Sequence, residues 1–388
     1  MTEEVKQPKG RTIKRRGRGE GSIYYDKKND RYAGSFYTQE GKRRYVYGKT
    51  EKEAREKLRA IQFEERQGML VTGPKQSVKD YLNYWLEEVH KSTLKLSTYA
   101  LYRRHLDNHI IPHLGHIQLK KLTTDQVQAF CSKLSTEGLK SGTVRLLHTI
   151  LYAALQDAMR WKRVAVNVCE AVKLPRYIQR EVHPLDQEQA RRLLQAAQGS
   201  RLDCILTLAL TTGMRLGEIL ALCWIDIDLE ERVLHVRHTV DYIQGHGWVE
   251  SEPKTANSRR SILLPQVTVD ALREHRASQL EARLKAGTTW KEQGLVFPNR
   301  YGGYFRRMRL YAIFKKLLQE ADLPDMHFHD LRHSAATILL SMGVPAKVVQ
   351  EILGHGNIST TMNIYGHVLP SMHRDAMDEM DDFFKGMV

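Results

Sequence analysis

The chain has 388 residues, of which 41% are hydrophobic and 27% charged, and it carries a formal net charge of +15. This composition can bury a core and excludes a chain that is disordered throughout. The sequence has no run of about 18 apolar residues, and its basic N-terminus lacks an apolar stretch, so we expect neither a membrane span nor a secretory signal. Four scattered cysteines without a CxxC pair favour a reducing cytoplasm and argue against a cysteine-built zinc site.

The positive charge is concentrated in the first part of the chain, for which the length predicts two or three domains. Residues 1–74 carry a net charge of +8 and residues 75–172 one of +6, whereas residues 173–388 carry +1. A strong positive charge implies a polyanionic partner, either a membrane surface or nucleic acid. Two basic segments ahead of a nearly neutral half are typical of DNA-binding domains that precede a catalytic domain.

Residues 1–20 predict a flexible basic arm that includes Arg15 and Arg16. Residues 21–70 predict a small α+β domain, because three short aromatic-rich strands are followed by a helix that begins at the capping box of Thr50 and Glu53. A three-stranded sheet backed by one helix can place its open face in a DNA major groove. The alternative is a structural domain with surface tyrosines. The side chains expected on the open face are Tyr24, Arg31, Tyr37, Arg43 and Arg44.

Residues 77–172 predict an all-α domain after a linker that contains Gly73 and Pro74. Apolar residues recur there at helical spacing and are interpreted as the core of a four-helix unit. Ser77, Ser97 and Thr124 are the predicted N-caps of three helices, and a long fourth helix is predicted to start at Ser141. No catalytic grouping is evident in this segment. Its basic residues that suit contacts with DNA phosphates are Arg103, Arg104, Lys120, Lys121, Lys140 and Arg145.

Residues 173–184 predict an extended linker, and residues 185–366 predict a mainly α domain with a small β-sheet. The strands are expected at 225–228, 233–240 and 260–264, and the helices at 202–211, 267–285, 306–321, 331–342, 345–353 and 359–365. Residues 367–388 predict an amphipathic tail helix with one acidic face. This tail helix could pack on its own domain or dock on a neighbouring protomer.

Three short segments in the last half combine polar residues that chemistry could use. The first contains Arg215 and Glu218 in a glycine-rich turn, and the second is His329 to His333 at the start of an apolar helix. The third is Leu353-Gly354-His355, which Tyr365 follows ten residues later. Taken singly, these segments have ordinary explanations, namely a surface ion pair, a polar network and a packed tyrosine.

Taken in order, the three segments resemble the tyrosine recombinase (phage integrase) family. The family order of Arg, Lys in a β-hairpin, His-x-x-Arg, His and Tyr is filled here by Arg215, Lys254, His329, Arg332, His355 and Tyr365. Residues 77–172 resemble the family's core-binding domain by position and length. Residues 21–70 resemble, more loosely, the arm-binding domain of integrases from phages and conjugative transposons.

The resemblance implies DNA strand cleavage by attack of Tyr365 on a phosphodiester, which leaves a 3′-phosphotyrosyl bond and a free 5′-hydroxyl. Arg215 and Arg332 would then hold the phosphate oxygens, and His329 would act as general base. His355 would donate a hydrogen bond to the phosphate, and Lys254 would protonate the leaving 5′-oxygen. Glu218 and His333 would support the two arginines.

A zinc site at His327, His329 and His333 is the rival interpretation, but no acidic pair accompanies these histidines and two arginines would repel a cation. The resemblance implies no metal and no cofactor. It also implies a homotetramer on paired sites of double-stranded DNA, both core and arm sites, with a host DNA-bending protein and a directionality factor as possible partners. We expect a protein of the bacterial cytoplasm and nucleoid, with no membrane partner.

The sequence thus predicts a site-specific recombinase that integrates or excises a phage or mobile element. A chromosome-dimer-resolving recombinase is disfavoured, since such enzymes typically lack the extra N-terminal domain. The alternative from another functional class is a catalytically inactive, architectural DNA-binding protein of the same fold.

Overall fold

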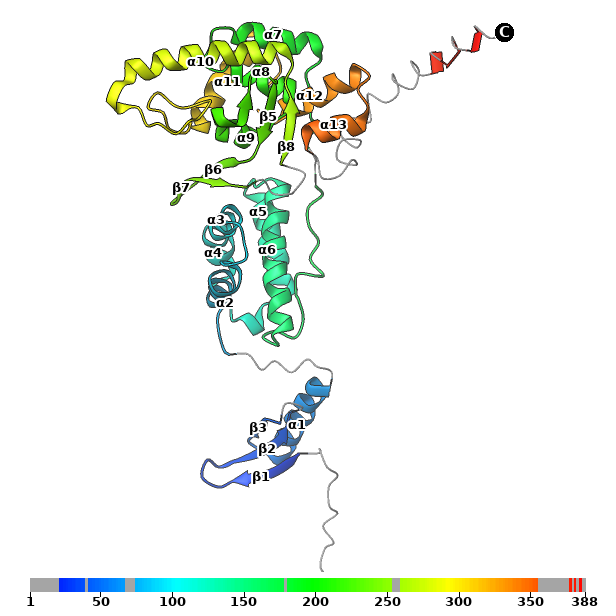
Figure 1. Cartoon of the computed structure of the whole chain (residues 1–388). Coiled ribbons are helices and arrows are strands. Elements are labelled where there is room, and N and C mark those ends of the chain that lie inside the picture. The colour runs from blue at the N-terminus through cyan, green and yellow to red at the C-terminus, as the bar shows by residue number, and fades with distance from the viewer. Residues whose placement is uncertain are drawn as a thin grey trace, which may run out of the picture. The chain divides into compact units, whose positions relative to one another are not determined.

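The computed structural model of the chain describes residues 21–38, 41–66, 74–177, 180–252 and 259–354, together with residues 377, 378, 380, 381, 384 and 385. The chain divides into two compact units, Met1–Gln179 and Arg180–Val388 (Figure 1). Several predictions fall outside the described residues, namely those for Arg15, Arg16, Lys254, His355, Tyr365 and the helix 359–365. No helix in the described part of the chain is long and apolar enough to cross a membrane.

The first unit begins with an antiparallel sheet in the order β1-β2-β3, made of β1 (Ser22–Asp26), β2 (Arg31–Tyr37) and β3 (Arg43–Gly48). Helix α1 (Glu51–Arg66) covers one face of this sheet, where Phe36 and Leu58 form a small core. The predicted cap is present, because Thr50 Oγ1 accepts from the Glu53 N–H at 3.2 Å, and the Glu53 carboxylate accepts from the N–H of Lys49, the residue before the cap, at 2.8 Å. The other face of the sheet has no covering helix among the described residues.

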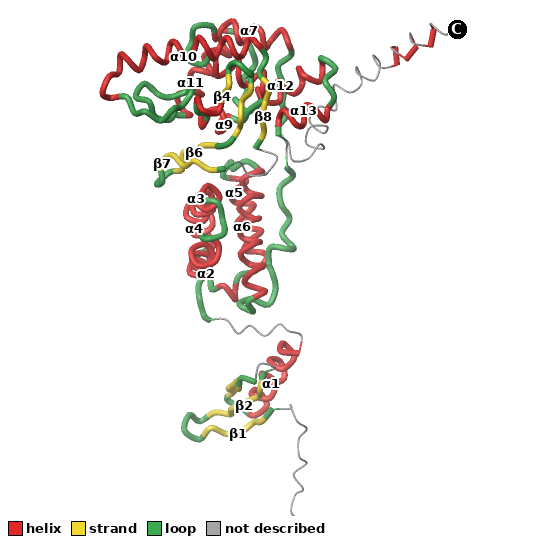
Figure 2. The backbone as a smooth tube through the Cα atoms, in the orientation of Figure 1, coloured by secondary structure: helices red, strands yellow, loops and turns green. Residues whose placement is uncertain are grey.

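The rest of the first unit is helical (Figure 2). Helix α2 (Val78–Tyr84) continues as the π-helix η1 (Trp85–His90), and α3 (Leu96–His105) continues through the π-helix η2 (Leu106–Ile110) into α4 (Ile111–Leu114). The 3-10 turn η3 (Leu119–Lys121), α5 (Thr124–Thr136) and α6 (Ser141–Arg160) follow. Trp85 and Tyr81 are buried against α6, where the Tyr81 hydroxyl donates to the Ala154 carbonyl at 2.5 Å.

Two of the three predicted N-caps in this helical domain are wrong, whereas α6 begins at Ser141 as predicted. Thr123 rather than Thr124 caps α5, because a capping box needs a Gln or Glu three residues on and Gln126 fills that position for Thr123. Ser97 lies inside the first turn of α3, which Lys95 precedes without a side-chain cap. Ser77 caps α2 through Asp80 as predicted.

The second unit combines helices with two small sheets. Its helices are α7 (Gln187–Ala197), α8 (Asp203–Thr212), α9 (Leu216–Ala221), α10 (Gln266–Ala286), α11 (Arg307–Glu320), α12 (Asp330–Ser341) and α13 (Ala346–Leu353), with short 3-10 turns η4 (Trp224–Asp226) and η6 (Gly287–Thr289). Strands β4 (Ile227–Asp228), β5 (Val233–Val236) and β8 (Arg260–Leu263) form one antiparallel sheet, and β6 (Thr239–Ile243) and β7 (Gly247–Ser251) form a hairpin. The single strand predicted at 233–240 is therefore wrong, since it is divided between β5 and β6.

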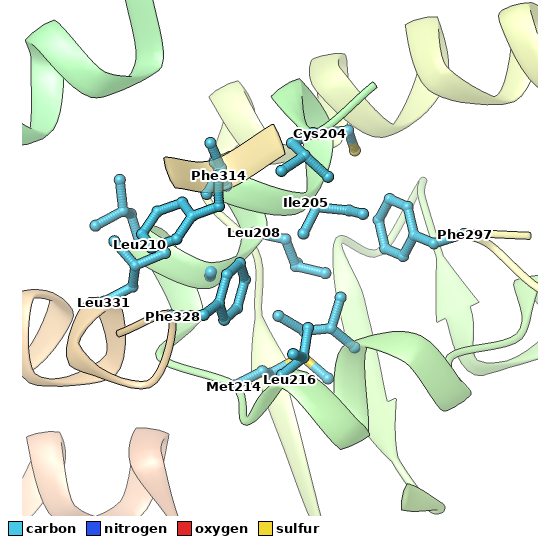
Figure 3. Close-up of a cluster of buried hydrophobic side chains, with 14 of the residues drawn as sticks. Cys204, Ile205, Leu208, Leu210, Met214, Leu216, Phe297, Phe314, Phe328 and Leu331 are labelled. Atoms are coloured by element: carbon cyan, nitrogen blue, oxygen red, sulfur yellow. The ribbon is translucent and has the colours of Figure 1, made fainter. Parts of the chain in front are cut away.

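The core of the second unit lies beneath the first two polar segments that the sequence singled out, those of Arg215 and of His329. Helix α8 is buried along nearly its whole length, and Leu208 lies at the centre of the cluster in Figure 3. Met214 and Leu216, the neighbours of Arg215, are 2% and 9% exposed, and Phe328, the neighbour of His329, is 3% exposed. Buried apolar neighbours thus fix the backbone from which the polar side chains project. The predicted fold class is confirmed, with a small α+β domain, an all-α domain and a mainly α domain with small sheets.

Candidate active site

Arg215 lies at the junction between α8 and α9. Gly213 ends α8 in the left-handed region with φ of 61°, and Arg215 follows in extended conformation as the residue before α9. Glu218, one helical turn later, accepts from the Arg215 backbone N–H at 3.0 Å and from its Nη1 at 2.7 Å. The Arg215 side chain is 38% exposed, whereas that of Glu218 is 3% exposed. A buried carboxylate therefore aims a partly exposed guanidinium.

Arg260 completes a buried ion pair that the sequence did not assign. Its Nη2 lies 3.1 Å from Oε2 of Glu218, and its Nε donates to the carbonyl of Ile352 at 2.8 Å. Burial would raise the pKa of Glu218, but the charges and hydrogen bonds of Arg260 and Arg215 outweigh it and hold this pKa below its usual value. Arg260 thus links α9 to the last turn of α13, two residues before Gly354.

Arg259 and Arg260 are two further cations that follow the predicted acid Lys254 by five and six residues. Arg260 is only 6% exposed and paired with Glu218. Arg259 is 59% exposed and pairs with Glu252 at 2.5 Å. The buried Arg260 is therefore committed to holding Glu218, and Lys254 stays the predicted acid.

Arg332 lies in the first turn of α12, which begins directly after His329. Its side chain is buried, and its Nη1 donates to the carbonyl of Gly213 at 2.7 Å, across 119 residues of sequence. Because Gly213 stands two residues before Arg215, this bond brings the two arginine-bearing segments together.

His329 keeps part of its surface exposed beside these arginines. Partial burial lowers its pKa, and the positive charges of His333, Arg332 and Arg215 lower it further, against an opposing effect of Asp330. The neutral imidazole is therefore favoured at neutral pH, and a neutral imidazole can accept a proton.

His333 packs edge to face against His329, with ring centroids 5.4 Å apart. Burial also lowers the pKa of His333, with Asp330 again raising it and Arg332 and Arg180 lowering it. Within the part of the chain that the structure describes, no group of three or more His, Cys, Asp or Glu side chains is arranged to hold a metal ion, and this includes His327, His329 and His333.

Asp330 is a further site residue that sequence reasoning missed. Its side chain is 6% exposed, and Oδ2 accepts from the His327 N–H at 2.7 Å and from Nη2 of Arg180 at 2.9 Å. The signal that could have found it is its position, because an acidic residue in the first turn of a helix interacts favourably with the helix dipole. Its partner Arg180 lies 150 residues away in the chain, and no sequence pattern predicts that the two residues are in contact.

The open face of the N-terminal sheet carries four of the five DNA-contact residues that were predicted for it. The strand register places Tyr24, Arg31, Tyr37 and Arg43 on this face, together with Tyr45 and Tyr47, which the sequence analysis did not select. The guanidinium of Arg31 lies 3.7 Å from the ring centre of Tyr47, and that of Arg43 lies 5.2 Å from that of Tyr45. The prediction for Arg44 on this face is wrong, since Arg44 pairs with Phe36 and consecutive strand residues point to opposite faces.

Two of the basic residues predicted to point outward from the helical domain are held by other parts of the protein. Arg103 pairs with Glu87 at 2.5 Å and donates to Asn83 at 2.8 Å, and it is 25% exposed. Arg145 donates from Nε to the carbonyl of Pro175 at 3.0 Å. Arg104 and Lys140 are exposed, as predicted for contacts with phosphates.

Gly213 is expected to be essential for the stability of this site. An added Cβ would lie 2.2 Å from Cδ2 of Leu353 on α13, and the positive φ disfavours any side chain. We expect Gly213→Ala to lower the free energy of unfolding by about 1–3 kcal/mol, measured by denaturant titration. Gly343→Ala is the matched control, because Gly343 also has a positive φ but no atom within 4 Å of the added Cβ. Equal losses in both variants would contradict the packing argument.

Comparison with known proteins identifies the family. Residues 183–372 match the family model described as phage integrase family, and residues 77–135 match that of the phage integrase N-terminal SAM-like domain. A tyrosine recombinase XerC-like protein of Caldanaerobacter subterraneus subsp. tengcongensis is 33% identical over 360 residues, which cover 88% of this chain and 92% of that protein. The integrase of Streptomyces ambofaciens is 28% identical over 392 residues, which cover 96% of this chain and 98% of that integrase.

Solved structures share the fold. The Tn1549 transposon integrase in complex with a circular intermediate DNA superposes with a TM-score of 0.67 at 22% identity, covering 79% of this chain and 99% of that one. A lambda integrase dimer bound to a COC′ core site gives a TM-score of 0.58 at 16% identity. The match covers 88% of this chain and 94% of the lambda integrase chain. The match to the family model and the XerC-like relative confirm the predicted family and enzyme class. The chain belongs to the tyrosine recombinase (phage integrase) family of site-specific recombinases, which act on DNA.

Proposed function

We propose that the protein cuts and rejoins DNA through a 3′-phosphotyrosyl intermediate on Tyr365, during integration or excision of a phage or mobile element. The observation that carries this proposal is the hydrogen bond from Arg332 to the Gly213 carbonyl. This bond joins the segment of Arg332 and His329 to the segment of Arg215, so that the three side chains lie close together. The similarity to the ICEBs1 integrase of Bacillus subtilis, 25% identical over 284 residues, supports a mobile element as the context. Trapping a covalent adduct on nicked DNA tests the proposal.

In this proposal the two arginines act on the phosphate. Their planar guanidinium groups offer paired donors to the non-bridging oxygens, and these donors stabilise the charge that develops in the pentavalent transition state. Arg332 is pre-oriented by burial and by its bond to Gly213, and Arg215 is pre-oriented by Glu218. Side chains that are already held in place lose little conformational freedom when the phosphate arrives.

Proton transfers are assigned to His329 and Lys254, and a hydrogen bond to the phosphate is assigned to His355. A free tyrosine has a pKa near 10, so Tyr365 needs a base to become a nucleophile, and the lowered pKa of His329 suits that role. Lys254 would protonate the 5′-oxygen as it leaves, and His355 would donate to the phosphate. The later attack of the 5′-hydroxyl on the phosphotyrosyl bond restores a phosphodiester without ATP, because the covalent link conserves the bond energy.

The DNA is held by the parts of the chain that precede the site. We assign arm-type binding to residues 21–70 with the basic residues 1–20, core-type binding to residues 77–172, the linker to 173–184 and catalysis to 185–366, with a tail at 367–388. The open-face arginines Arg31 and Arg43, each beside a tyrosine ring, support the arm-type assignment. A tetramer on paired sites is proposed by analogy with a lambda integrase tetramer bound to a Holliday junction, which has a TM-score of 0.56 with this chain. We also propose that the protein acts on DNA at the bacterial nucleoid in the cytoplasm. A host DNA-bending protein and a directionality factor would be its partners there.

Deletion of residues 1–70 is expected to abolish binding to distal arm sites while core-site cleavage survives. The slope of log affinity against log salt concentration should become shallower by about 0.9 for each DNA phosphate that the truncated protein no longer neutralises. Filter binding across a salt series measures the slope, and cleavage of a core-site duplex measures the second effect. Loss of core cleavage in the truncated protein would show that the assigned boundaries are wrong.

The adjacent residues Arg43 and Arg44 give a matched pair of substitutions for the same domain. Arg43→Gln removes a cation from the open face, and Arg44→Gln removes one from the face that α1 covers. Arm-site affinity should fall more for Arg43→Gln than for Arg44→Gln. The reverse order would contradict the assignment of the open face to DNA.

Chelation is expected to leave strand cleavage intact. The proposed chemistry uses arginine, histidine, lysine and tyrosine side chains only, so cleavage in the presence of EDTA should match cleavage without it. A nicked-duplex assay with EDTA, and with EDTA followed by added zinc or magnesium, measures this directly. Loss of activity that zinc restores would favour the histidine-chelate interpretation.

A further inference from the structure

The segment that enters the catalytic unit is fastened to α12 at two points. Arg180 donates from Nη2 to Oδ2 of Asp330 at 2.9 Å, and the Leu185 backbone N–H donates to Oγ of Ser334 at 2.9 Å. Ser334 is fully buried, and the Asp330 side chain is 6% exposed. The helix that carries Arg332 is therefore held by residues that stand about 150 positions earlier in the chain.

The other end of the same linker is fastened to the helical domain. The side chain of Gln128 donates to the Lys173 carbonyl at 3.0 Å and accepts from the Lys173 N–H at 2.8 Å. Arg145 donates to the Pro175 carbonyl at 3.0 Å. Residues 176–179 alone separate these contacts from Arg180. The linker thus has an anchored end in each unit and a short span between the anchors.

Asp330 depends on Arg180 for its charge balance. The carboxylate oxygen Oδ2 has two donors, the Arg180 guanidinium at 2.9 Å and the His327 N–H at 2.7 Å. A buried carboxylate that loses its cationic partner is strongly destabilised, so the surrounding backbone would rearrange to expose or solvate it. That backbone carries His329 immediately before Asp330 and Arg332 two residues after it.

We propose that Arg180 is a positioning residue for strand cleavage, whose ion pair with Asp330 fastens the linker to α12 and holds His329 and Arg332 in their working geometry. This inference rests on the proposed function, because it takes those two side chains as the groups that act on the phosphate. It assigns to the linker a second role besides connecting domains.

The test compares Arg180→Ala and Arg180→Lys in the full-length protein. Single-turnover adduct formation is measured on a nicked duplex whose sequence is taken from the DNA flanking the gene. We expect Arg180→Ala to lower the rate constant at saturating DNA by about tenfold to a hundredfold, with the dissociation constant unchanged, and Arg180→Lys to recover most of the rate. Arg192→Ala is the matched control, since Arg192 is 40% exposed and donates to the Ala321 and Asp322 carbonyls of the same unit, away from α12.

A wild-type rate for Arg180→Ala would overturn the proposal. A loss of DNA affinity that accounts for the whole loss of rate would also overturn it, because Arg180 would then be a phosphate ligand. Asp330→Asn should resemble Arg180→Ala, and the double variant should be no slower than the slower single variant. Additive losses would show that the two residues act separately.

A readout that needs no cleavage separates this inference from the proposed function. Amide hydrogen exchange over residues 327–332 should be faster in Arg180→Ala than in wild type and should return towards wild type in Arg180→Lys. If wild type forms no adduct but exchange responds in this way, the ion pair is upheld and the chemical assignment fails. Unchanged exchange in Arg180→Ala would overturn the positioning role whatever the chemistry.

Discussion

Replacing Arg332 by lysine is expected to lower the rate of strand cleavage by about a hundredfold to a thousandfold, the range seen when one preorganised donor to a transition-state charge is lost. Lysine keeps the positive charge but loses the planar fork that can bond a backbone carbonyl and a phosphate oxygen together. Arg332 uses Nη1 for the Gly213 carbonyl at 2.7 Å, so its function depends on this geometry rather than on charge alone. Single-turnover cleavage of a nicked duplex measures the effect.

Arg307→Lys is the control for this substitution. Arg307 also donates to a backbone carbonyl in the same unit, that of Val240 at 2.8 Å, and it is 31% exposed. Its lysine variant should cleave at nearly the wild-type rate. If Arg332→Lys also retained full activity while both variants stayed folded, Arg332 would not be a phosphate ligand.

Replacing Tyr365 by phenylalanine is expected to abolish the covalent adduct altogether. The phenolic oxygen is the proposed nucleophile, and phenylalanine removes that oxygen while keeping the ring. Wild-type protein should accumulate on a nicked suicide duplex as a band that resists denaturant, and Tyr365→Phe should give only the non-covalent complex, with similar affinity. Tyr311→Phe is the control, since Tyr311 is an exposed tyrosine of α11 to which no role is assigned. A covalent band from Tyr365→Phe would contradict the assignment of the nucleophile.

The sequence predicts side-chain contacts correctly where the two partners lie within one helical turn of each other. Arg215 and Glu218 are three residues apart, so one helical turn suffices to join them, and their contact at 2.7 Å follows from that spacing. The N-caps of α1 and α2 likewise join residues that lie within one helical turn. The order of the motifs along the chain pointed to the family, which the comparisons then showed.

Contacts between residues that lie far apart in the chain could not be predicted from the sequence. A shift of one residue along a strand could not be predicted either. Arg260 and Glu218 lie 42 positions apart, and Arg180 and Asp330 lie 150 positions apart. No pattern in the sequence around these residues predicts the two bonds. Arg103 and Arg145 were predicted to face solvent because helical periodicity places them off the apolar stripe, yet Glu87 and the linker backbone lie beside them. Arg44 was misplaced by one strand position, which reverses the face of the sheet.

The division of the strand predicted at 233–240 has a similar cause. Residues 233–243 are rich in Val, Ile, Thr and Tyr, which favour strands on both sides of the break, so composition could not show where β5 ends and β6 begins. Gly245 and Gly247, with φ of 83° and 78°, close that hairpin and place Tyr242 beside Trp248, with ring centroids 5.4 Å apart.

The most direct test of the proposed chemistry is to identify the amino acid that becomes linked to DNA. Wild-type protein trapped on a nicked suicide duplex would be digested with protease, and the DNA-linked peptide would be sequenced by mass spectrometry. The proposal predicts one modified residue, Tyr365, joined to a 3′-phosphate with a free 5′-hydroxyl on the other fragment. A linkage to any other residue, or to a 5′-phosphate, would contradict it.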